Sequence, residues 1–519
     1  KAELEPRLQG LVRRELLTVR ADPRSPDRGQ YAFVQALIRE VAYNTLAHAD
    51  RKSRHVAAAR FFESLGSDEL AGALAGHYLA AHENAPAGPE ADALAAQARI
   101  ALSAAAQRAI VLGSHDQAAV FLRQALAVTT DPAEEADLLG RAGEAASAAA
   151  HHDEAEKLLR RAVELHRARG DRPAITRATA ALASAMLATY RNEQALAVLE
   201  AAIEEFSDLE DDPGLVAILG QTARAYYLHE NAEVAIPIAD RALAAAERAD
   251  LVAIIADALV TRGAALGNLG RRYEGLTVIE GGLRLAERHG FSRIALRARV
   301  NLGALEGDVD PRAAFETGLA GLAEARRLGH RRPVMLFLTN SAELGILIGD
   351  WDWALPEMEE LLAGDLERED RMLMLSKLVW IRAWRGVEVG SLIDDLTDYA
   401  QEMQEPATGF ELAIALALRA FALGEFAEAA EGFQHAAGLT AGNAPLSYTF
   451  AARAALLSHD VARANAALSG LVATGVHSAT VDARRASIRA GVAALDGHDA
   501  EAHALYRDAL KGHRDTGVE

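Results

Sequence analysis

Sequence motifs with a defined catalytic purpose are missing from this chain. A phosphate-binding loop reads Gly-x4-Gly-Lys-Ser/Thr, so that backbone N–H groups and the lysine hold phosphate oxygens, yet the chain contains no Gly-Lys pair. The metalloprotease motif His-Glu-x-x-His and the hydrolase motif Gly-x-Ser-x-Gly do not occur either. We therefore expect no catalytic residue in this chain, and we do not expect it to be an enzyme by itself.

Histidines and carboxylates are frequent, but their spacing does not suit a metal site. The 17 histidines are scattered, and His498 and His503 are five residues apart, which is poor spacing for one face of a helix. His151 and His152 are adjacent and point to different faces. The acidic runs 204–212 and 357–360 are interpreted as solvated helix faces and loops. The sequence predicts no metal ligand.

Composition and charge narrow the class of protein. Half of the residues are hydrophobic but only 5% are aromatic, and much of the apolar content is alanine, the best helix former, so we expect an all-α fold. The net charge of −20 disfavours binding to nucleic acid. The absence of cysteine fits a reducing compartment, and no apolar run is long enough to span a membrane. We expect a cytoplasmic protein without a membrane partner.

A repeat of about 40 residues organises most of the chain. Its marker is a small residue followed four positions later by a large apolar residue and three positions later by another small one. From residue 118 to residue 354 the markers are 37, 40, 40, 40, 39 and 40 residues apart. The stretch 370–405 is degenerate and has no clear marker. The markers are Ala118, Ala155, Ala195, Ala235, Gly275, Ala314, Ala354, Ala429, Ala464 and Ala502.

Helix geometry explains the marker. Offsets of four and seven residues place the marker positions on one stripe of a helix, where small side chains let a partner helix pack closely. A glycine that precedes many of the stripes, such as Gly270 or Gly424, ends the first helix of the pair. One pair cannot bury its own apolar face, so the pairs stack into a continuous array.

This pattern resembles the tetratricopeptide repeat, in which helix A, a tight turn and helix B form each unit. The ordinary unit has about 34 residues, so this chain resembles the long-repeat branch found in the helical arms of large bacterial signalling ATPases. The resemblance implies a right-handed superhelix of about 10–11 helix pairs over residues 96–519, preceded by a helical connector at 66–95.

Residues 1–65 predict a different module. An amphipathic helix at 3–17, a strand at 17–20, a turn-rich loop at 22–29 and a strand at 30–34 are followed by helices at 36–46 and 51–65. Helix, strand, loop and strand form the C-terminal part of a winged helix. The chain begins without Met, so we expect it to be a piece of a longer protein.

The phrase YAFVQALIREVAYNTL at residues 31–46 resembles the junction in large bacterial regulators that join an AAA or STAND ATPase, a winged helix and tetratricopeptide repeats. The family phrase reads Phe-x-His-x-Leu-Ile-Arg-x-x-x-Tyr, and Gln35 replaces its His. Some relatives carry an adenylate/guanylate cyclase and others a LuxR-type DNA-binding domain. ATP is implied only for the parent protein. The matching residues are Phe33, Leu37, Ile38, Arg39, Val41 and Tyr43.

A winged helix also raises the question of DNA binding. Residues 1–60 hold twelve Lys/Arg and seven Asp/Glu, so this segment is cationic in an otherwise acidic chain. The resemblance implies that such a winged helix packs within its own protein, and we do not expect contact with DNA. The arginines available to phosphates are Arg13, Arg14, Arg20, Arg24 and Arg28.

The concave face of the array is the expected binding surface. A helices line this face in such superhelices, and peptides, partner domains or small effectors lie on it. The tryptophans of the degenerate repeat have an alternative interpretation as core residues that fill space where small-residue packing fails. The candidate partner-binding residues are Arg224, Tyr227, Asn268, Arg299, Asn340, Glu343, Trp380, Arg382 and Trp384.

Three functions stay open from the sequence. The first is a sensor or scaffold arm that binds a protein, peptide or small effector and regulates an upstream ATPase or cyclase. The second is the effector-binding arm of a LuxR-type, ATP-dependent transcription regulator. The third is a helical enzyme with a diffuse site.

Overall fold

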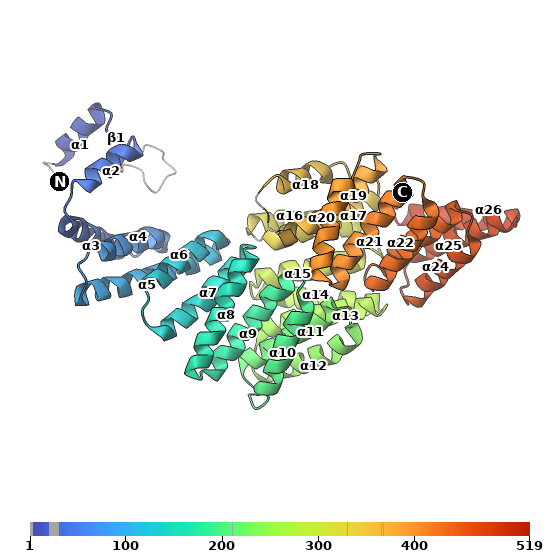
Figure 1. Ribbon diagram of the computed structural model, residues 1–519, viewed down its shortest axis with the longest axis horizontal. Coiled ribbons are helices and arrows are strands. Elements are labelled where there is room, and N and C mark those ends of the chain that lie inside the picture. The colour runs from blue at the N-terminus through green and yellow to red at the C-terminus, as the bar shows by residue number, and fades with distance from the viewer. Residues whose placement is uncertain are drawn as a thin grey trace. The chain divides into compact units, whose positions relative to one another are not determined.

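The structure is a computed structural model that describes residues 4–19, 31–209, 211–329, 331–364, 366 and 368–518 (Figure 1). The chain forms two compact units. One comprises residues 1–108 and 120–130, and the other comprises residues 109–119 and 131–519. Among the described residues, no helix is both long enough and apolar enough to cross a membrane.

The first unit opens with the elements that the sequence predicts. Strands β1 and β2 pair antiparallel, with Leu17 opposite Phe33 and Val19 opposite Tyr31. The predicted loop at 22–29 lies outside the described residues, together with Arg20, Arg24 and Arg28. The elements are α1 (Leu4–Arg13), β1 (Leu17–Val19), β2 (Tyr31–Phe33), α2 (Ala36–Asn44), α3 (His48–Leu65), a short 3-10 helix (Asp68–Leu70), α4 (Ala71–Glu83) and most of α5 (Pro89–Val111). Helix α6 (His115–Ala127) is shared between the two units.

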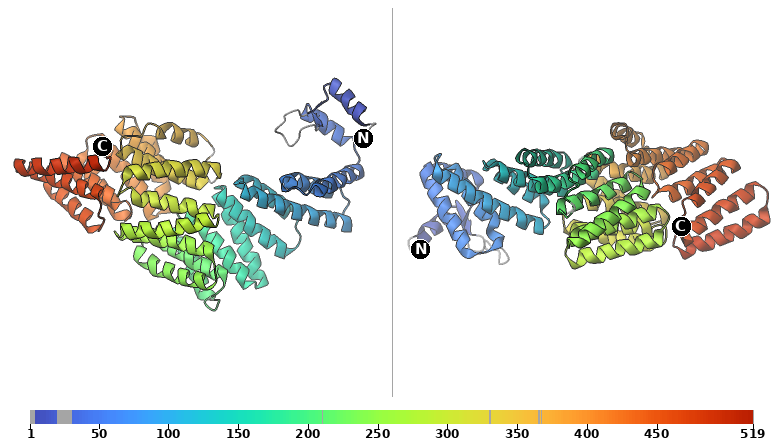
Figure 2. Two further views of the ribbon diagram at one scale, coloured as in Figure 1. Left: turned by 180° about the vertical axis from the view of Figure 1, so that it is seen from behind. Right: turned by 90° about the horizontal axis from the view of Figure 1, so that it is seen from below.

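The second unit contains ten consecutive helix pairs from α7 to α26, which confirms the all-α, tetratricopeptide-like fold (Figure 2). Odd-numbered helices are A helices and even-numbered helices are B helices. Their bounds are α7 (Pro132–Ala148), α8 (His152–Arg169), α9 (Arg172–Ala188), α10 (Asn192–Glu205), α11 (Pro213–Leu228), α12 (Ala232–Arg248), α13 (Val252–Asn268), α14 (Arg272–Arg288), α15 (Ser292–Glu306), α16 (Pro311–Arg327), α17 (Arg331–Leu347), α18 (Ala354–Leu362), α19 (Arg368–Trp384), α20 (Gly390–Met403), α21 (Pro406–Ala422), α22 (Phe426–Leu439), α23 (Ala444–Leu457), α24 (Val461–Ala473), α25 (Ala479–Leu495) and α26 (Asp499–Asp515).

The marker residues occupy the position predicted for them. In most pairs the marker is the fourth residue of the B helix and is buried, as Ala195 is in α10 and Ala429 is in α22. The degenerate stretch 370–405 forms an ordinary pair, α19 and α20, in which Ile393 stands at the fourth position of the B helix. A large side chain at that position removed the marker from the sequence without removing the helix pair.

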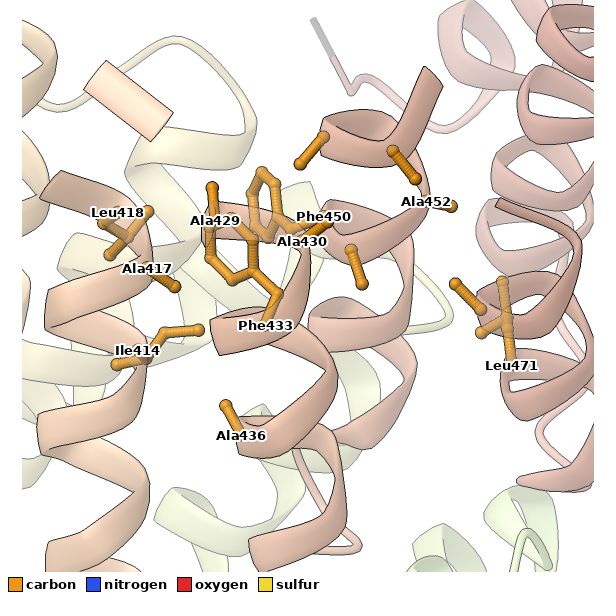
Figure 3. Close-up of a cluster of buried hydrophobic side chains, with 14 of the residues drawn as sticks. Ile414, Ala417, Leu418, Ala429, Ala430, Phe433, Ala436, Phe450, Ala452 and Leu471 are labelled. Carbon is orange, nitrogen blue, oxygen red and sulfur yellow. The ribbon is translucent and has the colours of Figure 1, made fainter. Parts of the chain in front are cut away.

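Large aromatic residues pack beside small ones in the core of the late pairs. In α21 to α23 the rings of Phe433 and Phe450 stack with centroids 5.3 Å apart, among alanines of the neighbouring helices (Figure 3). Trp380 of α19 meets Phe450 edge to face at 5.4 Å. These aromatic contacts join α19 to the pairs that follow it.

In most pairs, one residue of the turn between the A helix and the B helix adopts a left-handed backbone conformation. Glycine is favoured there because it has no Cβ to clash with the backbone. Glycine occupies this turn position at Gly270, Gly349, Gly386, Gly424 and Gly497. Four pairs hold a side chain there instead, at Ala150, Tyr190, Glu230 and His459.

The array folds back on itself, so that early A-to-B turns contact residues that come 170 to 213 positions later in the chain. Glu405, which precedes α21, accepts a hydrogen bond from the backbone N–H of Glu193 at 3.2 Å, across 212 residues. Glu230, after α11, accepts one from the N–H of Ala441 at 2.7 Å, across 211 residues. A third contact joins the turn at 308–309 to residues 478–484. The early and late pairs thereby enclose space between them.

Candidate functional site

A cavity of about 300 Å³, here called the central cavity, lies between the early and late pairs of the second unit. The early A helices contribute Tyr227 from α11, Asn268 from α13 and Asn340 from α17. The late pairs contribute Asn443, beside α23, and Arg484 from α25. The wall therefore combines residues that are far apart in the chain.

Four of the nine candidate binding residues line this cavity, namely Tyr227, Asn268, Asn340 and Glu343. All four belong to A helices, because the repeat frame places their side chains toward the inside of the array. Burial, followed by the charge of Glu230, raises the pKa of Tyr227 to about 12, so its hydroxyl stays a hydrogen-bond donor. The Tyr227 hydroxyl lies 3.4 Å from Asn301 Oδ1.

Two arginine candidates lie on A helices outside the cavity lining. Arg299 of α15 is engaged with neighbouring B helices, through Glu287 and Glu324 at 2.6 Å each. Arg224 lies one helical turn before Tyr227 on α11. Burial lowers the pKa of Arg224, and the nearby Arg297 lowers it further.

The three candidates of the degenerate repeat lie outside the lining of the central cavity. Trp380 is only 2% exposed and lies in the core with Phe450, as the alternative interpretation has it. Trp384 is partly buried and packs edge to face on Trp380, with ring centroids 5.7 Å apart. Arg382 forms an ion pair with Glu359 of α18 at 2.6 Å.

Lys377 is not among the residues predicted from the sequence, and it reaches the cavity from the buried face of α19. Its ammonium lies 2.9 Å from Glu343 and 3.8 Å from Glu411. Burial alone would lower the pKa of Lys377, but the two carboxylates outweigh it and the pKa is raised, so the ammonium stays charged. The signal in the sequence is a single lysine within the apolar run 372–381.

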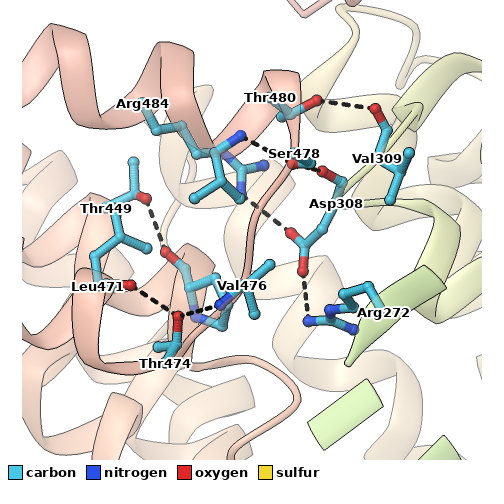
Figure 4. Close-up of polar contacts among 12 residues, drawn as sticks. Arg272, Asp308, Val309, Thr449, Leu471, Thr474, Val476, Ser478, Thr480 and Arg484 are labelled. Carbon is cyan, nitrogen blue, oxygen red and sulfur yellow. Dashed lines mark hydrogen bonds and ion pairs between the residues drawn. The ribbon is translucent and has the colours of Figure 1, made fainter. Parts of the chain in front are cut away.

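A buried charge cluster also escaped the sequence analysis because its members come from three separate pairs. Asp308 lies 2.6 Å from Arg272 and 3.2 Å from Arg484, and the two arginines are 3% and 4% exposed (Figure 4). Ser478 donates to the backbone carbonyl of Asp308, and Thr480 donates to that of Val309 at 3.3 Å. The cluster joins α14 and the α15–α16 turn to α25.

Two residues of the lining, Tyr190 and Glu230, adopt a φ of 58° at the turn position where glycine recurs. A side chain in this region costs about 1–2 kcal/mol relative to the right-handed region, and such outliers gather at functional sites. Glu230 also lines a second cavity of about 320 Å³, here called the side cavity, which shares Glu230 and Asn268 with the central one.

The fold and the cavity define the class of protein: an all-α, tetratricopeptide-like solenoid with a polar, ligand-sized cavity between its early and late helix pairs. Among the described residues, no group of three or more His, Cys, Asp or Glu side chains could hold a metal ion.

Among solved structures, the chain is similar to a Rap protein whose crystal structure is described as complexed with competence and sporulation factor. The two share 16% sequence identity, the match covers 76% of this chain and 97% of that chain, and the TM-score is 0.44. No protein-family model matches the chain, and no curated protein sequence matches it.

Proposed function

We propose that this protein is a ligand-binding sensor arm, and that a short peptide or a compact polar effector binds in the central cavity. The observation that supports this function is that both early and late helix pairs line the cavity. Early residues such as Asn268 and late residues such as Asn443 face the same space. A ligand that contacts both favours the arrangement in which early and late pairs lie together. Binding is thereby converted into a change in the closure of the array.

The chemistry of the lining suits a ligand rich in amide or hydroxyl groups. Asn268, Asn340 and Asn443 each offer both a donor and an acceptor, and Thr339 and Thr440 add hydroxyls. A volume of about 300 Å³ is at the lower end of the range for small-molecule sites. A peptide end or a small effector fits this volume better than a folded partner domain does.

The wider role follows from the sequence resemblance alone. We propose that ligand binding is transmitted through residues 66–95 and the winged-helix segment 1–65 to an upstream ATPase, and in some parents to a cyclase. The support is the phrase at residues 31–46, which is typical of such cytoplasmic bacterial regulators. ATP would bind to the parent protein and not to the segment described above.

Filling the central cavity tests the proposed site. Gly303 of α15 is buried and lines the cavity, and a Cβ added to it meets no atom within 4 Å. Gly303→Phe should therefore place a ring in the cavity while the helix gains propensity. We expect native protein to retain members of a random pentapeptide pool or a metabolite mixture through gel filtration, with at least tenfold less retained by the variant, as measured by mass spectrometry.

The matched control is Gly281→Phe. Gly281 also lies within a helix with no atom within 4 Å of an added Cβ, but it is exposed on α14. This variant should retain ligands as native protein does. Retention that Gly303→Phe does not reduce, or no retention by native protein at all, would show that the cavity is not the ligand site.

A further inference from the structure

We infer that the ligand carries a cationic amine and that the carboxylate of Glu230 binds it. This inference rests on the proposed function and specifies the chemical class of the ligand. The amine can be the amino terminus of a peptide or the amino group of a small effector, because both present the same ammonium group to a carboxylate.

The charge balance of the central cavity favours a cationic ligand. Its lining holds four carboxylates and three cationic side chains, so one carboxylate is in excess. Asp308 is paired with Arg272 and Arg484, and Glu343 and Glu411 share Lys377. Among the described residues, Glu230 is the carboxylate of this lining without an ion pair to a Lys or Arg side chain.

The geometry of Glu230 leaves one of its carboxylate oxygens available to a ligand. One of its oxygens, Oε2, accepts from the backbone N–H of Ala441 at 2.7 Å, which fixes the carboxylate between the early and late pairs. Within the described part of the chain, Oε1 has no hydrogen-bond donor. This oxygen is free to accept from a ligand ammonium.

The surroundings of Glu230 favour the approach of an amine. Among the residues that the structure describes, Glu230 is the sole charged residue of the side cavity, whose other lining residues are neutral, such as Asn268 and Tyr448. An amine can therefore reach it from the side cavity without passing a competing cation. Burial raises the pKa of Glu230, although the Ala441 N–H and His229 lower it, and a bound ammonium would further stabilise the charged carboxylate.

The backbone conformation of Glu230 also supports a function for its side chain. Glu230 adopts a left-handed φ at a turn position where Gly270 and Gly424 stand in other pairs. A glycine here would relieve strain but would remove the carboxylate from both cavities. The turn itself does not favour a side chain at this position. A functional role for the Glu230 carboxylate accounts for its presence there.

The test uses the complete chain and two peptide pools. One is a pool of random pentapeptides with free amino termini, and the other is the same pool after acetylation of those termini. Native protein should retain the free pool at least tenfold better than the acetylated pool, as measured by mass spectrometry after gel filtration. Spermidine, measured in the same way, tests a free amine as the source.

Glu230→Gln is the decisive variant, because glutamine keeps an acceptor for the Ala441 N–H and removes only the charge. Its retention of the free pool, or of spermidine, should fall at least tenfold, and circular dichroism should show an unchanged fold. Glu247→Gln, on the exposed face of α12, is the matched control and should bind as native protein does.

The outcomes separate the two proposals. Equal retention of both pools, lost in Gly303→Phe but not in Glu230→Gln, would overturn the amine inference and leave the proposed site standing. Glu230-dependent retention of spermidine alone would support the inference with a free amine as ligand. Retention of neither peptides nor spermidine would overturn the inference, and if the metabolite mixture were not retained either, the proposed function would fall with it.

Discussion

At the scale of single residues, the junction after α11 makes two contacts with late loops. His229 Nδ1 lies 3.6 Å from the carboxylate of Glu405, and the next residue, Glu230, bonds to Ala441. Two successive side chains of one turn thereby contact two different late loops. We expect a change at this turn to alter both the cavity and the closure of the array.

The raised pKa of Glu230 predicts a pH dependence of stability. Because the folded protein binds this proton more tightly than the unfolded chain, the stabilising contribution is full below the ordinary value of 4.5 and is lost as pH rises through the raised folded value. The neighbouring His229 and the Ala441 N–H oppose this shift without cancelling it. We expect Glu230→Gln to gain stability relative to native protein between about pH 4 and pH 7.

Urea unfolding at several pH values measures this difference. Glu247→Gln removes an exposed carboxylate and should show no comparable trend relative to native protein. A Glu230→Gln variant that lost relative stability as pH rose would mean that the native carboxylate is favoured in its charged form, contrary to its environment.

At the scale of elements, the two helices of a pair pack together through residues of different size in different pairs. Gly263 and Gly275 let α13 and α14 approach so closely that a Cβ on Gly275 would lie 2.6 Å from the carbonyl oxygen of Gly263. The α19–α20 pair instead uses large residues such as Ile393 and Tyr399 in its core. The repeat thus conserves the position of its helices and not the size of its side chains.

The charge cluster around Asp308 determines how firmly α25 is attached to the early pairs. In Asp308→Asn, the buried Arg272 and Arg484 would lose their common counter-charge. Breaking a buried ion pair on one side typically costs about 3–5 kcal/mol. We expect a loss of about 3 kcal/mol in the free energy of unfolding, measured by urea denaturation.

The control for this cluster is an exposed pair. Glu280 and Arg284 are four residues apart on α14, with atoms 3.2 Å apart and both side chains largely in solvent. Glu280→Gln should cost about 0.5 kcal/mol or less. Equal effects of the two substitutions would show that the Asp308 cluster contributes no more than a surface pair does.

At the scale of the second unit, closure depends on contacts between residues 170 to 213 positions apart. Glu405 is 7% exposed and accepts from the N–H of Glu193 at 3.2 Å and from Asn192 Nδ2 at 3.4 Å. Glu405→Ala removes both bonds and should free the first turn of α10 from α21. We expect amide exchange at Glu193 to become roughly tenfold faster, since about 1.4 kcal/mol of protection corresponds to a factor of ten.

Hydrogen–deuterium exchange with mass spectrometry measures this change. Glu425→Ala is the control, because Glu425 also precedes a helix but is exposed and makes no side-chain capping bond. Exchange near Glu193 that stayed at the native rate in Glu405→Ala would show that the early and late pairs are held together without this contact.

The sequence by itself determined the repeat and the all-α class, and it predicted that A-helix residues face inward. These features depend on neighbours along the chain: a small residue at a fixed offset buries a B helix, and a left-handed turn ends an A helix. Candidates such as Asn268 and Asn340 could therefore be chosen from spacing alone. The structure brings both to the central cavity.

Only the tertiary structure decided where the array closes and which residues meet there. Closure depends on small rotations between successive pairs, which accumulate over about 210 residues and leave no mark in the local pattern. Lys377 and Arg484 could not be assigned to one site with Tyr227, because their proximity exists only after that accumulation. The same holds for Glu230, whose environment is set by a late loop that no short-range pattern connects to it.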